Sequence, residues 1–203
     1  MVQPILALKY LPTGETLMDR FSFGPRDNEI IQIAYTVAEI QDGMRHYSDL
    51  LHVGPWFLVG PFVPPKGVYR GATTSMQVSL GIAFSGQVMV ELIEQHDEEP
   101  SVFRETLRAR GAHGFHHWAI GARDFEKTSA QYRSRGYHEA FSDFAPMGFR
   151  VVYFDTSHHL SGMLEVIEMN AAAEEGFHKM YRAAKEWDGK THIVHHLETR
   201  QPA

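Results

Sequence analysis

Apolar and polar residues alternate along several short segments of this chain, a pattern typical of half-buried β-strands. Four such segments fall into two pairs, and each pair consists of an opening strand and a closing strand. The pairs are residues 31–37 (IQIAYTV) with 88–94 (VMVELIE), and 116–122 (HHWAIGA) with 163–169 (MLEVIEM). The chain is therefore predicted to contain an internal repeat.

Each opening strand is followed by a helical pattern and then by two further strands. In the first unit, apolar side chains recur at helical spacing within residues 39–54, which end at Gly54 and Pro55. The second unit shows a comparable helix over residues 124–136. The additional strands are predicted at 56–62 and 75–85, and at 139–145 and 149–156. Both units therefore have the order β, α, β, β, β.

An offset of 85 residues superimposes the two opening strands and the helices that follow. Three pairs match at this offset: Gln32 with His117, Ala34 with Ala119, and Tyr47 with Tyr132. The closing strands bring Glu91 and Glu165 to equivalent points of the two units. Residues that can bind a metal ion thus recur at equivalent positions, so the candidate ligands are Gln32, Glu91, His117 and Glu165.

The physical setting of these residues favours a shared cation. Glu91 and Glu165 lie in otherwise apolar strands, where an unpaired carboxylate costs several kcal/mol. The small neighbours Ala34 and Ala119 leave room for an ion on the strand faces that carry Gln32 and His117. The chain has no cysteine, which excludes disulfides, thiolate nucleophiles and Cys-ligated zinc. Any metal must therefore be held by nitrogen and oxygen donors.

Composition excludes several classes of partner. With 25 acidic and 19 basic residues the formal charge is -6, and no run of Lys or Arg offers a surface for nucleic acid or an anionic membrane. No segment approaches 18 consecutive apolar residues, and the first residues lack the features of a secretory signal. We therefore expect a cytoplasmic protein with no nucleic-acid or membrane partner.

The expected fold class is α+β, with two tandem βαβββ modules that form a cupped, curved mixed β-sheet with helices outside. The predicted parts are an N-terminal arm (1–28), the first module (29–97), a connecting helix (98–112), the second module (113–170), and a C-terminal helix and tail (171–203). The final helix is expected to pack on the outside of the second sheet.

Particular segments carry a family resemblance. The repeated βαβββ order, HHWAI followed by RDFEKTSAQYRSRGY, and the closing strands VELIE and LEVIE resemble the vicinal oxygen chelate superfamily over roughly residues 29–170. That superfamily includes glyoxalase I, methylmalonyl-CoA epimerase, extradiol dioxygenases and bleomycin or fosfomycin resistance proteins. The resemblance implies that each half donates one metal ligand from its first strand and one from its last. The implied ligands are again Gln32, Glu91, His117 and Glu165.

Two branches of the superfamily resemble different parts of the chain. The ligand set of Gln, Glu, His and Glu is similar to that of zinc-type glyoxalase I. However, Thr36 and His113 stand where glyoxalase I has the arginines that hold glutathione, which argues against glutathione as cosubstrate. The segment EPSVFRETL followed by GAHGFHHWAI is closer to the epimerase-like branch.

The resemblance implies a metal-dependent lyase or isomerase of the glyoxalase/epimerase type. Such an enzyme abstracts a proton next to a metal-bound carbonyl through an enediolate, with Glu165 as the main base and Glu91 as its partner. It would use one divalent metal, zinc as the first choice and nickel, cobalt, manganese or iron as alternatives. Its substrate would be a small molecule with vicinal oxygens, and a homodimer is expected.

Two other functions remain open from the sequence. A non-catalytic, ligand-sequestering protein of the resistance type would use an aromatic cup and could dispense with the metal. An extradiol-type dioxygenase would require two His and one carboxylate, and Gln32 argues against it. His116 adjoins His117 by one register step, which on a strand reverses the face, and the resemblance favours His117 as the ligand.

Overall fold

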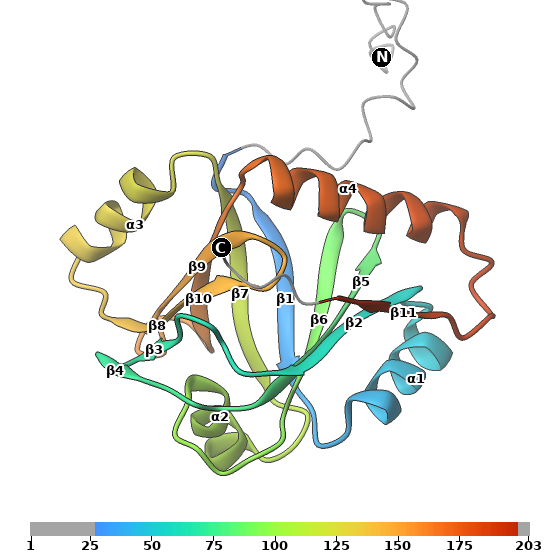
Figure 1. The fold of residues 1–203 in the computed structure, drawn as a ribbon, viewed down its shortest axis with the longest axis horizontal. Coiled ribbons are helices and arrows are strands. Elements are labelled where there is room, and N and C mark those ends of the chain that lie inside the picture. The colour runs from blue at the N-terminus through green and yellow to red at the C-terminus, as the bar shows by residue number, and fades with distance from the viewer. Residues whose placement is uncertain (1–26, 199–203) are drawn as a thin grey trace, which may run out of the picture.

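One continuous sheet of eleven strands runs through the protein, whose computed structural model describes residues 27–198. The expected arm at 1–28 lies almost wholly outside these residues. The strands are β1 (Ile30–Thr36), β2 (Trp56–Phe62), β3 (Val68–Tyr69), β4 (Ala72–Thr73), β5 (Val78–Ser85), β6 (Val88–Gln95), β7 (Phe115–Ala122), β8 (Glu139–Ala145), β9 (Phe149–Phe154), β10 (Met163–Glu168) and β11 (Val194–Leu197). The helices are α1 (Ile40–Leu51), α2 (Val102–Arg110), α3 (Phe125–Ser134) and α4 (Ala171–Glu186) (Figure 1).

The strand order displays the internal repeat. Across the sheet the order is β11-β2-β5-β6-β1-β7-β10-β9-β8-β3-β4. The opening strands β1 and β7 pair antiparallel at the centre, and each pairs in parallel with the closing strand of its own half, β6 or β10. The predicted α+β fold of two βαβββ modules in a curved mixed sheet is confirmed. The residue boundaries of the modules stay predictions.

Two helices each cover one half of the sheet on the side away from the cup. Ile40 and Met44 of α1 are buried in a cluster with residues of β2, β5 and β6. The backbone N–H of Ile40 donates to the Glu94 carboxylate at 2.8 Å, which satisfies one donor of the first helical turn. In the other half, Phe125 of α3 packs in a separate cluster with residues of β7, β9 and β10. The Asp124 side chain caps this helix by accepting from the Lys127 N–H.

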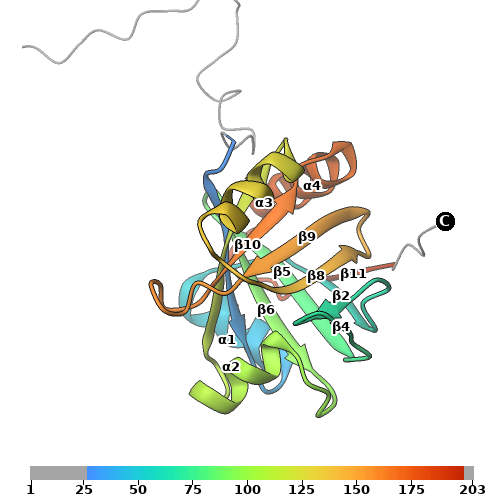
Figure 2. The same cartoon turned by 90° about the vertical axis from the view of Figure 1, so that its left-hand side faces the viewer.

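The other two helices add apolar side chains to the core inside the cup. α2 and α4 lie at opposite ends of the central strands, as both views show (Figures 1 and 2). Phe103 of α2 and Phe177 of α4 both belong to this core. The expectation that α4 packs on the outside of the second sheet is wrong, because α4 packs on β5 of the first half. The outer face of the second half is covered by α3, and α4 packs inside the cup, where its Phe177 ring contacts Phe149.

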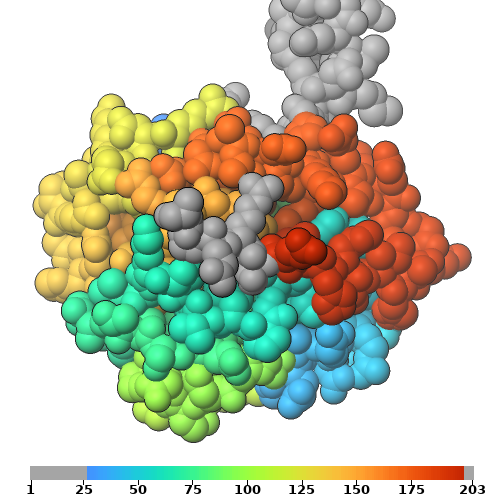
Figure 3. Space-filling view, viewed as in Figure 1, coloured from blue at the N-terminus to red at the C-terminus, as the bar shows by residue number. Residues whose placement is uncertain are grey.

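The segment between β2 and β5 ties the two halves together. After β2 the chain crosses the open side of the cup to β3, which pairs with β8 of the second half (Figure 1). In the space-filling view the teal residues of this region lie against the yellow and orange residues of the second half (Figure 3). The sequence predicted only a loop here, because the two short strands β3 and β4 have no long alternating pattern of their own.

A short strand from the tail extends the sheet at its other edge. β11 pairs in parallel with β2, and the His195 ring stacks on Phe57 with 4.8 Å between centroids. No pattern in the sequence indicated this strand, because VHHL is short and half polar. Among the described residues, no helix is long and apolar enough to cross a membrane.

Replacing Gly162 with Ala should destabilise the fold. A β-carbon at this position would overlap the backbone carbonyl of His116 and the ring of Phe115. Because that carbonyl belongs to β7, we expect the free energy of unfolding to fall by about 1–3 kcal/mol.

Gly176→Ala is the matched control, because a β-carbon there meets nothing within 4 Å in the middle of α4. This variant should gain up to about 1 kcal/mol. Urea unfolding of both variants makes the comparison, and a Gly162→Ala protein as stable as the wild type would contradict the packing described.

Candidate functional site

Four adjacent strands at the centre of the sheet supply the four candidate residues. β6, β1, β7 and β10 lie in this order and carry Glu91, Gln32, His117 and Glu165 respectively. All four side chains are buried, with exposed fractions of 5%, 2%, 0% and 3% in the same order. The structure therefore brings together all four residues that the repeat predicts.

Two buried alanines lie between the functional residues of these strands. Ala34 lies between Glu91 and His117, since it is in register with both. Ala119 lies in the same way between Gln32 and Glu165. Both alanines are fully buried, and a methyl group leaves the space above the sheet to the longer side chains on either side. The four functional groups therefore converge instead of standing apart in a row.

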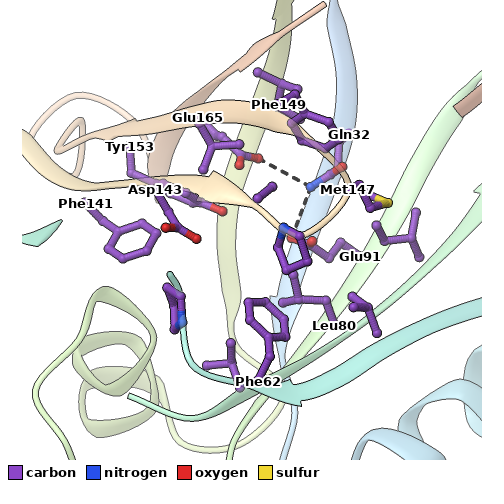
Figure 4. Close-up of a pocket in the computed structure, with 18 of the residues that line it drawn as sticks. Gln32, Phe62, Leu80, Glu91, Phe141, Asp143, Met147, Phe149, Tyr153 and Glu165 are labelled. Carbon is purple, nitrogen blue, oxygen red and sulfur yellow. Dashed lines mark hydrogen bonds between the residues drawn. The ribbon is translucent and has the colours of Figure 1, made fainter. Parts of the chain in front are cut away.

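The functional groups are within hydrogen-bond distance of one another. The amide Nε2 of Gln32 lies 3.1 Å from Glu91 Oε2, 3.2 Å from His117 Nε2 and 3.4 Å from Glu165 Oε2. The imidazole Nε2 of His117 lies 3.0 Å from Glu165 Oε2 and 3.5 Å from Glu91 Oε2. Figure 4 shows the Gln32 amide nitrogen between the two carboxylates.

Burial places the Glu91 carboxyl group in an environment that opposes its ionisation. Burial, and next the nearby Glu165 carboxylate, raise the pKa of Glu91 well above its usual value. Among the described residues, the ion pairs of both glutamates are with His117 alone. A pair of buried carboxylates with a single imidazole partner is a strongly cation-attracting arrangement.

The donor set fits a divalent metal ion after one local change. A tetrahedral ion with ligand bonds of about 2.0 Å separates its ligands by about 3.3 Å, close to the distances seen here. In the described residues, no three His, Cys, Asp or Glu side chains by themselves form a metal-ligating group. The amide nitrogen of Gln32, which is a donor, stands at the fourth corner, 3.1–3.4 Å from the facing atoms of Glu91, His117 and Glu165. Rotating this amide by 180° would present Oε1 instead, which gives one nitrogen and three oxygen ligands.

His116 contacts the imidazole of His117 and orients it. The Nδ1 atoms of the two rings are 2.7 Å apart, and His116 is buried on the other face of β7. Burial, and next the neighbouring His117, lower the pKa of His116 well below its usual value, so His116 is neutral. When Nδ1 of His117 donates to His116, Nε2 of His117 carries a lone pair toward the centre, which is the metal-binding form.

A cavity opens directly above the four residues. It encloses about 610 Å³ of space, part of it open to solvent, and Gln32, Glu91 and Glu165 form part of its wall. The rest of the wall is predominantly apolar, with six aromatic residues: Phe62, Phe103, Phe141, Phe149, Tyr153 and Phe177. A small molecule in this cavity would meet the polar cluster at one end and aromatic rings around its body.

Comparison with protein families identifies the group to which this architecture belongs. A family model described as Glyoxalase/Bleomycin resistance protein/Dioxygenase superfamily matches residues 31–153, which is more than half of the chain. The chain belongs to this superfamily. The match spans β1 to β9 and includes three of the four candidate residues, Gln32, Glu91 and His117. No curated protein sequence matched the chain.

Solved structures share the fold of this superfamily member at low sequence identity. A hypothetical protein from Bacillus halodurans C-125 is 22% identical with a TM-score of 0.55, over 71% of this chain and 96% of that chain. Methylmalonyl-CoA epimerase from Mycobacterium tuberculosis is 18% identical with a TM-score of 0.51, over 68% and 86% of the two chains. A Streptomyces coelicolor epimerase variant in complex with 2-nitronate-propionyl-CoA is 16% identical with a TM-score of 0.52, over 72% and 97%. At these identities the likeness shows the fold alone.

Tyr153 is a further site residue that was not among the candidates proposed from the sequence. Its ring meets His117 edge to face, with 4.9 Å between centroids. Burial, and then the charges of Glu165 and Glu91, raise the pKa of Tyr153 well above its usual value, and a hydrogen bond to Glu165 adds to the effect. Tyr153 therefore keeps its proton and can donate to the Glu165 carboxylate.

Asp143 is a third carboxylate in this superfamily member's cavity, and the sequence interpretation missed it. It lies on β8 between Phe141 and Ala145, which face the same cavity. Burial raises its pKa to about 6, although backbone N–H groups of Lys66 and Phe144 oppose the shift. A charged residue at an inward position of an alternating strand was the available signal in EAFSDFA.

Thr36 and His113, which stand at the positions of the glutathione-binding arginines, have local structural roles. Thr36 is buried, and its hydroxyl donates to the Gly114 carbonyl at 3.3 Å. His113 lies in the turn before β7 with a φ of 68°. Neither residue lines the cavity.

The raised pKa of Asp143 predicts a specific pH dependence of stability. The folded protein holds this proton up to about pH 6, whereas the usual value is 3.8, so the folded state binds more protons in between. Stability contributed by the protonated form is therefore lost as pH rises through this window. Relative to Asp143→Asn, the wild type should lose about 2 kcal/mol between pH 4 and pH 7.

Urea unfolding at several pH values tests this prediction. Glu168→Gln is a control of opposite sign, because hydrogen bonding to Arg150 lowers the pKa of Glu168. Parallel stability curves for Asp143→Asn and the wild type would show that Asp143 does not have the raised pKa.

Proposed function

We propose that the protein is a metal-dependent lyase or isomerase that removes a proton from a carbon next to a carbonyl group. The observation that carries this proposal is the convergence of Gln32, Glu91, His117 and Glu165, with 3.0–3.5 Å between the measured donor and acceptor atoms, at one end of a largely apolar cavity. Members of the superfamily commonly bind a divalent metal, and solved epimerases with this fold bind CoA esters.

One divalent ion would be held by these four side chains. His117 would contribute Nε2, Gln32 its amide oxygen after rotation, and the two glutamates their carboxylate oxygens. Zinc is the first choice for such a nitrogen and oxygen set, with nickel, cobalt, manganese and iron as alternatives. When bound, the ion would supply Lewis acidity that polarises the substrate carbonyl and would hold two vicinal oxygens.

Glu165 is the proposed base. It lies at the cavity wall beside Tyr153, which is able to donate a hydrogen bond to its carboxylate and fix its orientation. Its carboxylate would take the proton from carbon, the C–H electron pair would form a C=C bond, and the carbonyl π electrons would move onto oxygen to give an enediolate. Return of the proton to the same or the adjacent carbon would complete epimerisation or isomerisation.

Glu91 is the proposed partner of Glu165. In the metal-free protein its pKa is raised well above the usual value, which favours uptake of a proton, and it lies on β6, across the two opening strands from Glu165 on β10. A proton held on this side could be delivered to the opposite face of the enediolate. The apolar wall excludes water, which would otherwise compete for the proton and screen the charges.

Metal content is the first test of this proposal. Protein purified without added metal or chelator should hold about one divalent ion per chain. A free metal concentration about 100-fold above Kd should add about 2.7 kcal/mol to the free energy of unfolding. Both effects should disappear in His117→Ala and Glu165→Ala.

His159→Ala is the matched control for metal content, because it removes a histidine from the turn at residues 155–162 and leaves the four candidate ligands intact. Retention of metal in His117→Ala and Glu165→Ala would place the ion elsewhere and would overturn the assigned ligands.

Proton abstraction can be measured without knowing the natural substrate. The CH₂ protons of 2-hydroxyacetophenone, which has vicinal oxygens, should exchange with deuterium in D₂O in the presence of the protein, followed by proton NMR. Glu165→Gln should slow this exchange by a factor of about 10² to 10⁴. Glu168→Gln, which removes a carboxylate near the end of the same strand, should leave the rate unchanged. Undiminished exchange in Glu165→Gln would reject Glu165 as the base.

The aromatic wall favours a second candidate function, a non-catalytic protein that sequesters a ligand. In that case the cavity would bind its ligand equally well with and without metal, and no deuterium exchange would occur. The dioxygenase alternative is less favoured, because the centre contains a single His and His116 lies on the other face of β7. The homodimer and the cytoplasmic location stay predictions.

A further inference from the structure

The cavity wall carries a carboxylate but no basic residue opposite the candidate metal ligands. Among the described residues that line it, none is Lys or Arg, and those with polar side-chain groups are Gln32, Glu91, Asp143, Tyr153 and Glu165. Asp143 on β8 is separated from Glu165 on β10 by β9. Two strand spacings correspond to about 10 Å across the sheet. A substrate of this length bound at Glu165 would be able to reach Asp143, since both residues line the cavity.

Asp143 is fixed in place by the segment that crosses the cup. The backbone N–H of Lys66 donates to Asp143 Oδ1 at 2.9 Å, and the Asp143 residue is only 9% exposed. The ammonium group of Lys66 lies 5.7 Å from the ring centroid of Phe144. Phe144 follows Asp143 on β8, so its side chain points to the other face of the strand. Lys66 therefore does not neutralise the Asp143 carboxylate within the cavity. The Asp143 carboxylate therefore lines the cavity, held by backbone N–H groups and without an ion pair among the described residues.

The charges of the cavity add up to an environment that repels anions. Three carboxylates, from Glu91, Asp143 and Glu165, face one divalent ion at most. The ion would be held by the two glutamates, so Asp143 has no cation opposite it among the described residues of the wall. An anionic substituent in the body of the cavity would therefore lose its hydration without gaining a partner.

We infer that this cavity selects an uncharged aromatic or apolar substrate with vicinal oxygens at one end, and that Asp143 is the residue that excludes anionic substituents and accepts a hydrogen bond from a hydroxyl group. This inference rests on the proposed function, since it names the substrate class of the same site. A charged carrier group, as in a CoA ester, would have to remain outside the cup.

Three related ligands test the inference by isothermal titration calorimetry with metal-loaded protein. They are 2-hydroxyacetophenone, its 4-hydroxymethyl derivative, and its 4-carboxylate. The wild type should bind the two neutral ketones at least about tenfold more tightly than the carboxylate, since like charges repel in a desolvated site. Equal or tighter binding of the carboxylate, or no binding of any of the three, would overturn the inference.

Variants assign the selectivity to Asp143. Asp143→Asn keeps the shape and the acceptor for the Lys66 N–H, and it should reduce the discrimination against the carboxylate to within about threefold. Glu139→Gln removes an exposed carboxylate from the same strand and should leave the discrimination unchanged. Unchanged discrimination in Asp143→Asn would show that Asp143 is not the selective residue.

A second variant makes the test independent of how well Asp143→Asn folds. Met147 lines the cavity from the turn between β8 and β9, so Met147→Lys should bring a cation to the wall. This variant should bind the carboxylate at least as tightly as the neutral ketone, and persistent rejection of the carboxylate would contradict the charge argument. Because these measurements need no turnover, an absence of deuterium exchange would count against the proposed function alone.

Discussion

The antiparallel pairing of β1 with β7 is the constraint on which the site depends. It places Ala34 beside His117 and Ala119 beside Gln32, and the parallel partners β6 and β10 then bring Glu91 and Glu165 to the outer sides of the same two alanines. A slip of one residue in this register would turn the side chains of a whole strand to the other face. The centre is therefore a property of the junction between the two halves, and neither half could form it alone.

The sequence was sufficient to predict the residues of this centre, because the same strand pattern occurs twice along the chain. Alternation in IQIAYTV and HHWAIGA indicated strands, and the offset that joins Gln32 to His117 also joined the alanines that turn out to separate the ligands. Each of the apolar segments VELIE and LEVIE places a carboxylate at a position expected to be buried. Such a mismatch between residue type and environment is common at functional sites, so it indicated a functional role for Glu91 and Glu165. The structure brings these residues together, and their role as ligands stays a prediction.

The parts that the sequence did not predict depend on contacts between distant segments. α4 was expected on the outer surface. Its apolar pattern predicts a buried helix face but does not specify which surface covers that face. In the structure Phe177 of α4 packs on Phe149 inside the cup. Asp143 gains its significance from burial and from the Lys66 N–H, which comes from a crossing segment that looked like an ordinary loop. In the sequence Tyr153 cannot be distinguished from an ordinary core aromatic. Only the pairing of β9 with β10 places it opposite Glu165.

The central claim is that one divalent ion is held between β1, β6, β7 and β10. The most direct measurement is anomalous diffraction from crystals of the wild-type protein equilibrated with zinc, recorded above and below the zinc absorption edge. The account predicts one strong peak within about 2.0–2.2 Å of His117 Nε2 and of oxygen atoms from Gln32, Glu91 and Glu165. The absence of a peak at this position, or a peak only at the surface histidines, would contradict it.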